Sequence, residues 1–127
     1  MIYFFDNNIS YRYVRMLAAL DVAAKALREE FPEDITDCDL FDRLRGKDNV
    51  FITADESIRR REAEARALRQ CGITALFLGP FWAKMLFWEQ AIWLVSRWRR
   101  IDAFASSVAQ GTCAELKRNG RALPFAL

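Results

Sequence analysis

Short runs of apolar, strand-forming residues recur along the chain and are separated by longer, mixed segments. The runs are IYFF (2–5), VFIT (50–53) and ITALFL (73–78), and GTCAEL (111–116) is a weaker fourth candidate. Unbroken apolar runs of this length are typical of strands that are buried on both faces, as in a parallel sheet. The pattern therefore predicts a sheet that is covered on both sides.

Helical patterns lie between these runs. Ser10 is a suitable N-cap for one helix, and Thr36 is a suitable N-cap for a short helix over 37–44. A further helix over 62–70 is expected to stop at Gly72. Strands that alternate with helices favour an α/β domain with a largely parallel sheet.

The longest helical pattern covers about 81–107. Its most apolar part, 81–95, is too short to cross a bilayer and contains Lys84, Glu89 and Gln90, so a buried helix is favoured over a membrane helix. The spacing of its apolar stripe favours the core or a dimer interface over the stacking of nucleic-acid bases. The stripe consists of Met85, Trp88, Ile92, Val95 and Trp98.

One segment and two turns complete the pattern. The segment DVAAKALREEF (21–31) favours a helix by propensity and ends at Pro32. GKDN (46–49) and Asn119-Gly120 are turn signals.

Composition limits the chemistry. A chain of 127 residues that is 53% hydrophobic is expected to form one domain over 1–127. The chain contains no histidine, which excludes histidine-dependent nucleophilic catalysis and histidine-containing zinc sites. Three cysteines, with no ligand-like spacing, are expected to be reduced thiols of a cytoplasmic protein. Asp6 interrupts the first apolar run, so no signal peptide is expected.

The net charge of +2 is unevenly distributed. Residues 1–80 contain 12 basic and 14 acidic side chains, whereas residues 81–127 contain 7 basic and 3 acidic ones. This asymmetry is mild, so it permits a nucleic-acid partner without requiring one.

Two carboxylates follow predicted strands. Asp6 comes directly after the first strand and Asp55 closely follows the second, so both should lie at the edge where parallel strands end. Asp37 opens a predicted helix, and Glu64 lies in the helix after Asp55. Four carboxylates at one edge repel one another unless a cation such as Mg²⁺ or Mn²⁺ binds them through oxygen.

Each of these side chains has a simpler alternative role. Aspartate is common at strand ends and helix caps for local hydrogen-bonding reasons, and this explanation is favoured for Asp37 and Glu64 taken alone. Asp39 and Asp42 are rival ligands or solvated side chains. Asn7 and Asn8 are candidates for orienting ligands or a substrate phosphate.

Three consecutive arginines follow Asp55. Arg59, Arg60 and Arg61 are candidates for contacting phosphates near the metal site. The alternative is an exposed helix start in which they pair with Glu62 and Glu64. Both interpretations remain open from the residues alone.

Taken in order, several motifs resemble one family. FFDNNIS, LREEFPEDITD, FITADESIRR, the acidic residue at 64, LFLGPFWAKMLFWEQAIWLVSRW and GTCAEL together resemble the PIN-like domains of VapC-type toxins. The resemblance implies a three-layer α/β/α PIN-like fold with a mainly parallel central sheet, and a strand near 23–28. It places Asp6, Asp37 and Asp55 on the family's acidic positions and Glu64 on a recurrent glutamate.

The resemblance also implies a function. The expected protein is a Mg²⁺-dependent ribonuclease, the toxin of a toxin–antitoxin pair, in which water activated by the ions attacks the phosphodiester in line. Expected partners are RNA, a cognate antitoxin protein and a second copy of the chain, with no membrane. The alternatives are an inactive PIN-like module that binds a protein or nucleic acid, and a nuclease that cleaves DNA.

Overall fold

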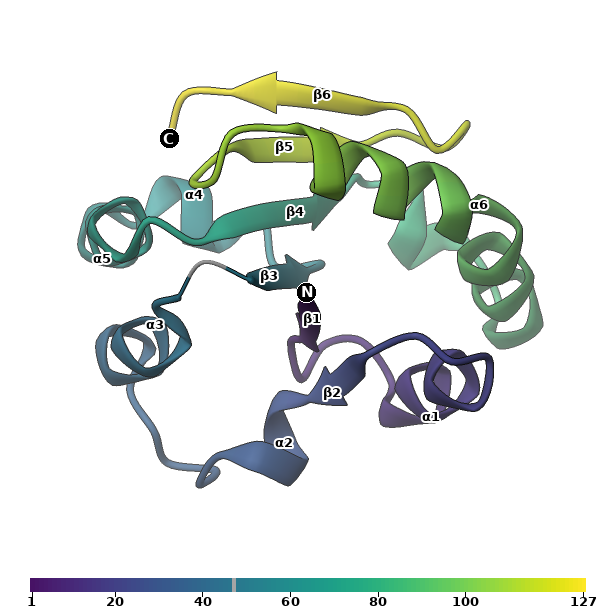
Figure 1. The fold of residues 1–127 in the computed structure, drawn as a ribbon, viewed down its shortest axis with the longest axis horizontal. Coiled ribbons are helices and arrows are strands. Elements are labelled where there is room, and N and C mark those ends of the chain that lie inside the picture. Colours follow the sequence, from purple (N-terminus) through teal and green to yellow (C-terminus); the bar gives the residue numbers. More distant parts are fainter. Residues whose placement is uncertain (47) are drawn as a thin grey trace.

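The computed structural model describes residues 1–46 and 48–127, so Lys47 of the predicted turn at 46–49 lies outside the described residues. It contains a six-stranded sheet of order β2-β1-β3-β4-β5-β6 (Figure 1). All neighbouring strands are parallel except β6, which runs antiparallel to β5. The strands are β1 (Ile2–Phe5), β2 (Ala24–Ala26), β3 (Asn49–Thr53), β4 (Thr74–Leu78), β5 (Cys113–Leu116) and β6 (Ala122–Phe125).

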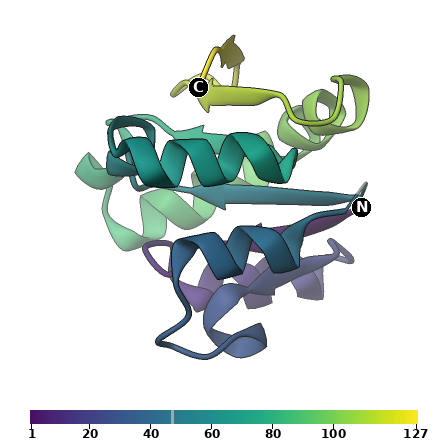
Figure 2. The same cartoon turned by 90° about the vertical axis from the view of Figure 1, so that its left-hand side faces the viewer.

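Helices cover both faces of this sheet. Figures 1 and 2 show α3 and α5 on one face, and Figure 1 shows α1 and α6 on the other. The arrangement confirms the predicted three-layer α/β/α fold with a mainly parallel sheet. The helices are α1 (Tyr11–Ala19), α2 (Leu27–Glu30), α3 (Asp37–Leu44), α4 (Ser57–Arg60), α5 (Glu62–Cys71) and α6 (Phe87–Ser107), and a 3₁₀ turn, η1 (Trp82–Lys84), precedes α6.

Side chains that point alternately to the two faces of the sheet divide the interior into two cores. Tyr3 and Phe5 of β1 face α1 and α6, whereas Phe4 between them faces α2 and α3. The same alternation separates Ile52 from Phe51 in β3. Because both faces are covered, the strands are apolar throughout, which is why they are readable as unbroken hydrophobic runs.

Local hydrogen bonds begin the helices at the predicted caps. The Ser10 hydroxyl accepts from the Arg12 backbone N–H at 3.2 Å, and the Thr36 hydroxyl accepts from the Asp39 N–H at 3.2 Å. Gly72 ends α5 in the left-handed region, at φ 71°. These three predictions are confirmed.

The ambiguous segment 21–31 contains both kinds of structure. Residues 24–26 form β2, whose Lys25 pairs with Phe4 of β1, and α2 follows immediately. The helix predicted by propensity is therefore wrong for β2, and the strand implied by the resemblance is right there. Pairing with β1 overrides the helical preference of the alanines.

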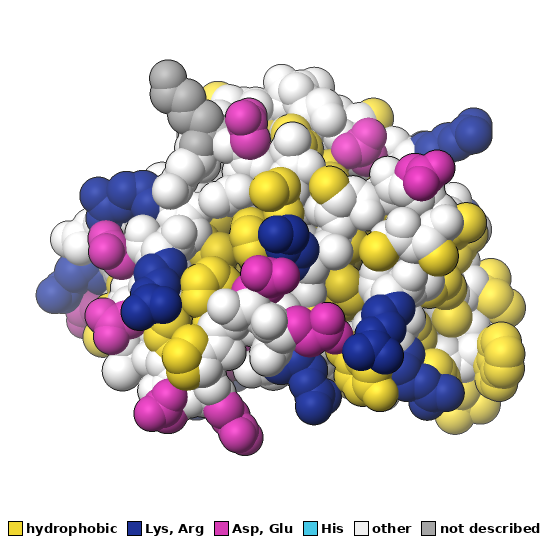
Figure 3. Space-filling view, turned by 60° about the horizontal axis from the view of Figure 1, so that its bottom comes forward, with side chains coloured by type: hydrophobic (Ala, Val, Ile, Leu, Met, Phe, Trp, Pro, Cys, Tyr) yellow, Lys and Arg dark blue, Asp and Glu magenta, His cyan; other side chains and the backbone are white. Residues whose placement is uncertain are grey.

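Only part of the apolar stripe predicted on the long helix is buried, because Trp98 lies in the core and Met85 packs against it, whereas the other three members are exposed. Trp88 is 79% exposed and Ile92 is 64% exposed, while Trp93, Leu94 and Trp98 pack against the sheet. Both faces of α6 carry apolar residues, and only contact with the sheet decides which one is inside. Figure 3 shows hydrophobic side chains at the right-hand edge of the molecule, on the side where α6 begins. Among the described residues, no helix combines the length and apolar character needed to cross a bilayer.

Candidate functional site

A hydrogen-bonded group joins the carboxyl ends of β1 and β3. The Thr53 hydroxyl donates to Asp6 Oδ2 at 2.7 Å, and the Asn8 side-chain amide donates to the Thr53 oxygen at 3.3 Å and to Asp6 Oδ2 at 3.4 Å. Asn8 Oδ1 in turn accepts from the Ala54 N–H at 3.1 Å. Asn8 therefore ties the loop after β1 to the loop after β3, and together with Thr53 it holds the Asp6 carboxylate.

Thr53 was missed by the sequence analysis. It is fully buried at the end of β3, and its hydroxyl also accepts from the Asp55 N–H at 3.0 Å. The available signal was a hydroxyl residue at the end of an apolar strand, two positions before a carboxylate. A buried hydroxyl needs hydrogen-bond partners, and here those partners are Asp6, Asn8 and Asp55.

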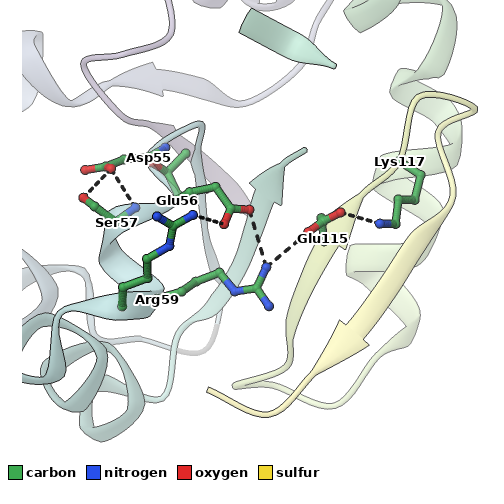
Figure 4. Close-up of polar contacts among 8 residues, drawn as sticks. Asp55, Glu56, Ser57, Arg59, Glu115 and Lys117 are labelled. Atoms are coloured by element: carbon green, nitrogen blue, oxygen red, sulfur yellow. Dashed lines mark hydrogen bonds and ion pairs between the residues drawn. The ribbon is translucent and has the colours of Figure 1, made fainter. Parts of the chain in front are cut away.

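Asp55 has a local structural role in addition to its place at the edge. Its Oδ1 accepts from the backbone N–H of Ser57 at 3.0 Å and from the Ser57 hydroxyl at 2.5 Å, at the start of α4 (Figure 4). This is the capping role that the alternative interpretation attributes to aspartate. One carboxylate oxygen is therefore used locally, and a role in binding depends on the other.

Helices α3 and α5 bring two further carboxylates to the same edge. Asp37 is the first residue of α3, and Glu64 is the third residue of α5. The pKa of Asp37 is raised by burial first, and then by the negative charges of Glu64, Asp6 and Asp55. The four predicted acids are therefore close enough for their charges to interact. The rivals Asp39 and Asp42 are exposed, and Asp42 pairs with Arg45 at 3.2 Å.

Burial and repulsion also act on Asp6. Burial raises its pKa, and the charge of Asp55 raises it further, whereas hydrogen bonds from Thr53, Asn7 and Asn8 lower it. The Asn7 contact is its backbone N–H, which donates to Asp6 Oδ1 at 2.8 Å. The site thus contains partly desolvated carboxylates whose mutual repulsion a cation would relieve.

The donor set fits a hard divalent cation in its chemistry. Every candidate donor is an oxygen, as Mg²⁺ and Mn²⁺ prefer. Within residues 1–46 and 48–127, no three acidic, cysteine or histidine side chains are arranged to hold one ion. Charges interact over longer distances than coordination bonds, and Mg²⁺ is usually held by one or two carboxylates with water and substrate completing its shell. Two of these carboxylates are therefore enough to bind such a cation.

A cavity of about 370 Å³ lies beside two of the carboxylates. Its wall combines polar groups with apolar side chains from α2, the loop that leads to α3, and α3 itself. Space next to Asp6 and Asp37 is what a substrate segment would need. The lining residues are Asp6, Asn7, Leu27, Arg28, Phe31, Pro32, Glu33, Ile35, Asp37 and Leu40.

Of the three consecutive arginines, Arg59 has a structural position. Its guanidinium donates to Glu115 of β5 at 3.1 Å and lies 3.5 Å from Glu56 (Figure 4). The same guanidinium stacks 3.6 Å from the centre of the Phe125 ring. Lys117 also pairs with Glu115, and the two cations, Lys117 first and then Arg59, lower the pKa of the Glu115 carboxyl. Arg59 therefore ties α4 to the β5–β6 hairpin.

The other two arginines are more exposed. Arg60 is 3.8 Å from Glu56, with 78% of its side chain exposed. Arg61 pairs with Glu64 at 3.1 Å, so it neutralises part of the acidic group. The pairing alternative is thus right for Arg61, whereas Glu62 pairs with Arg66 instead.

Comparison with known proteins agrees with this geometry. A family model described as "PIN like domain" matches residues 1–80, which include β1 to β4 and all four candidate acids. Neither a search of curated proteins nor a search of solved structures returned a match. PIN-like domains have a nuclease-type fold and are generally nucleases. With more than half of its length matched, the chain belongs to the family of PIN-like domains.

Proposed function

We propose that this PIN-like domain is a metal-dependent endoribonuclease and the toxin of a toxin–antitoxin pair. The nuclease proposal is supported by one observation above all. Asp6, Asp37, Asp55 and Glu64 gather where the parallel strands end, and the charges of the other three raise the pKa of Asp37. The toxin role rests on the resemblance of the ordered motifs to VapC-type proteins.

In this proposal each side chain has a stated task. Asp6, Asp37 and Asp55 would hold Mg²⁺ or Mn²⁺ two carboxylates at a time, with water and substrate completing the coordination, and Glu64 would assist. When bound, the cation supplies a Lewis acid that activates water and stabilises the leaving oxygen of a phosphodiester. Asn8 and Thr53 orient the Asp6 carboxylate through the hydrogen bonds described above.

RNA binding is proposed to use exposed groups at the rim of the site. Arg60 and Arg61 follow Asp55 along the chain and are candidates for contacting phosphates, because 78% and 61% of their side chains are exposed. Asn7 is exposed beside the cavity and is a candidate for contacting the same backbone. Arg59 is proposed to act indirectly, because its guanidinium is occupied by Glu56, Glu115 and Phe125.

The first experiment is a cleavage assay on labelled single-stranded RNA and DNA, with and without Mg²⁺ or Mn²⁺. We expect metal-dependent cleavage of RNA, and its loss in Asp6→Asn and Asp55→Asn. Asp42→Asn is the matched control, because Asp42 is an exposed aspartate of α3 whose partner is Arg45. Cleavage that survives in both site variants would indicate a contaminant, and preferred cleavage of DNA would replace the RNA proposal.

A growth experiment tests the toxin role separately. We expect induction of the wild-type chain in a bacterial host to arrest growth and induction of Asp6→Asn to leave growth unaffected. Equal growth with both proteins, despite cleavage in the assay, would argue for a nuclease that is not a toxin.

The second candidate is a non-catalytic module that binds a partner protein such as an antitoxin. The observation that favours it is the exposed apolar face of α6, because a solvent-exposed tryptophan among aliphatic side chains marks an interaction surface. If no RNA is cleaved and Mg²⁺ leaves the melting temperature unchanged, this candidate replaces the nuclease.

A further inference from the structure

The cavity beside Asp6 and Asp37 extends past these carboxylates into a region that cation binding does not use. Its volume of about 370 Å³ lies within the range of pockets that hold small-molecule ligands, about 300–1,000 Å³. The additional wall comes from α2, from Leu40 of α3 and from the loop joining the two helices, at the lower left of Figure 1. A group attached to a phosphate at the acidic site would therefore have room beside it.

Much of this additional wall is apolar, and it includes one aromatic ring. Phe31 is partly buried, and its ring centre lies 6.3 Å from that of Phe4 in β1. Leu27, Ile35 and Leu40 pack into the same core cluster. Nucleobases stack on aromatic side chains when they leave a single strand, so a wall of this kind suits a flat base better than a sugar or a phosphate.

Two side chains of opposite charge also line the cavity. Arg28 and Glu33 are both exposed there. Within the part of the chain that the structure describes, neither of them forms an ion pair. A phosphate would be attracted by Arg28 but repelled by Glu33. A neutral ligand that offers both hydrogen-bond acceptors and donors matches the pair better.

The Arg28 guanidinium is positioned by an aromatic ring. It lies 4.9 Å from the centre of the Tyr11 ring, and the Arg15 guanidinium lies 4.7 Å from the same centre. A guanidinium over a ring keeps its N–H donors in its own plane, so this contact does not consume them. Arg28 is therefore held in place while its donors stay available to a ligand.

We propose that this cavity is a guanine-binding subsite, which takes a guanine base of single-stranded RNA next to the phosphate at the acidic site. Phe31 stacks on the base, Arg28 donates to its O6 and N7 atoms, and Glu33 accepts from its N1–H and its amine. The inference rests on the proposed nuclease function, because the base belongs to the strand that the acidic site would cut.

The pairing of Arg28 with Glu33 favours guanine among the four bases. Guanine has two neighbouring acceptors, O6 and N7, which match the fork of a guanidinium. It also has two neighbouring donors, N1–H and the amine, which match the two oxygens of a carboxylate. Adenine lacks neighbouring acceptors that a fork could bridge, cytosine has a single donor group, and the ring N–H of uracil lies between two carbonyls.

Fluorescence anisotropy of labelled RNA tests the preference. The probes are an oligoadenylate and the same strand with one central guanosine or cytidine, in buffer without divalent cations so that the strands stay intact. We expect the guanosine strand to bind wild type about tenfold more tightly than the other two. Equal dissociation constants, a preference for cytidine or no detectable binding of any strand would overturn the proposal.

Base analogues test which side chain reads which edge. Replacing guanosine by 7-deazaguanosine removes the N7 acceptor, and replacing it by inosine removes the amine. We expect both analogues to weaken binding to wild type. The first should cause little further loss in Arg28→Ala and the second little further loss in Glu33→Ala, because the partner group is already missing.

Matched controls for these two variants lie nearby in the chain. Arg43→Ala and Asp34→Ala change exposed residues that do not line the cavity, so both should show the full wild-type losses. Full losses in Arg28→Ala and Glu33→Ala as well would overturn the assigned contacts. Thermal melts followed by circular dichroism verify that each variant is folded.

The stacking contact has its own test. We expect Phe31→Leu to weaken binding of the guanosine strand and the oligoadenylate by a similar factor, since stacking uses the face of a base rather than its edges. Phe87→Leu is the control, at a ring that is 37% exposed on α6. Wild-type affinity in Phe31→Leu would overturn the role of this ring.

Photo-crosslinking locates the base independently of affinity. A strand with 6-thioguanosine in place of guanosine is irradiated on the wild-type chain, and the modified peptide is identified by mass spectrometry. We expect the crosslink within residues 27–40, and a crosslink confined to any other segment would overturn the proposal. An inactive protein that selects guanine would contradict only the nuclease proposal, whereas an active nuclease without base preference would contradict only this inference.

Discussion

Asp6 is a carboxylate that the fold partly removes from water at the end of β1. Because burial and the charge of Asp55 raise its pKa, the folded protein holds a proton on Asp6 at pH values where the unfolded chain has lost it. The folded state is therefore penalised increasingly as pH rises from the unfolded pKa through the higher folded pKa. The same sign applies to Asp37, whose pKa is also raised.

This linkage predicts a pH-dependent difference between wild type and Asp6→Asn. As pH rises from about 4, near the unfolded pKa of aspartate, to neutrality, we expect the melting temperature of wild type to fall relative to that of Asp6→Asn. The measurement is a series of thermal melts without divalent cations. A constant difference across this range would show that Asp6 does not carry a raised pKa.

Adding a divalent cation should reverse this fall in the melting temperature of wild type at neutral pH. Mg²⁺ or Mn²⁺ is expected to raise the melting temperature of wild type and to raise that of Asp6→Asn much less, since a ligand that binds only the folded state stabilises it. Asp42→Asn should respond as wild type does. Equal shifts in all three proteins would mean that the cation binds elsewhere.

The sequence identified Arg59 as a candidate for contacting phosphate but did not predict its contacts with Glu56, Glu115 and Phe125. We expect Arg59→Ala to lower the free energy of unfolding by about 1–2 kcal/mol, the combined value of a partly shielded ion pair and a cation–π contact. Denaturant unfolding measures it. Arg60→Ala is the control and should change stability by less than about 0.5 kcal/mol, because most of its side chain is exposed.

At the scale of elements, the β5–β6 hairpin depends on its turn. Gly120 has φ 86°, and a Cβ there would lie 2.7 Å from Arg97 Cδ, whereas Gly72 has φ 71° and nothing within 4 Å of such a Cβ. An alanine at either position would be strained by the positive φ, but only at position 120 would its Cβ also clash with the Arg97 side chain. We expect Gly72→Ala to cost about 1 kcal/mol and Gly120→Ala about 2–3 kcal/mol, as measured by denaturant unfolding.

Equal losses for the two variants would mean that the Arg97 side chain moves aside at no cost. The comparison isolates the packing of the turn against α6, because the backbone requirement is similar at both positions.

The predictability of the elements follows from how they are buried. β1, β3 and β4 were readable because strands covered on both faces are apolar throughout, and the caps at Ser10 and Thr36 were readable from side-chain chemistry. β6 was not predicted, because Ala122–Phe125 is short, half-exposed and contains Pro124. The stripe predicted on α6 is buried only at Trp98 and partly at Met85, because periodicity identifies a face without saying what covers it.

The site was predictable to a similar extent. Topology alone places Asp6 and Asp55 at one edge, since parallel strands end together. The convergence of Asp37 and Glu64 depends on how α3 packs against α5, which no local pattern encodes. Thr53 was missed because its importance lies in hydrogen bonds to loops that are distant in sequence.

At the scale of the whole molecule, the family match ends at residue 80 although the sheet does not. A chain of residues 1–80 would lack the α6 side chains that cover one face, including Trp93, Leu94 and Trp98. Each such loss costs about 2–5 kcal/mol, so together they exceed a typical total stability of about 5–15 kcal/mol. We expect chain 1–80 to show no cooperative thermal transition by circular dichroism.

Co-expression with residues 81–127 is the corresponding control and should restore a folded complex. A cooperative transition in the shorter chain alone would mean that its sheet face is covered in another way, and that α6, β5 and β6 are accessory.

The two outer strands restrict how this molecule can recruit others. β2 is only three residues long, and β6 contains Pro124, which has no N–H to donate. Short or proline-containing edge strands are poor templates for an added strand. Neither edge of the sheet therefore favours pairing with an extended peptide or amyloid-like stacking. Recognition must therefore pass through side chains on helices and loops, where single substitutions can retune it without disturbing the sheet.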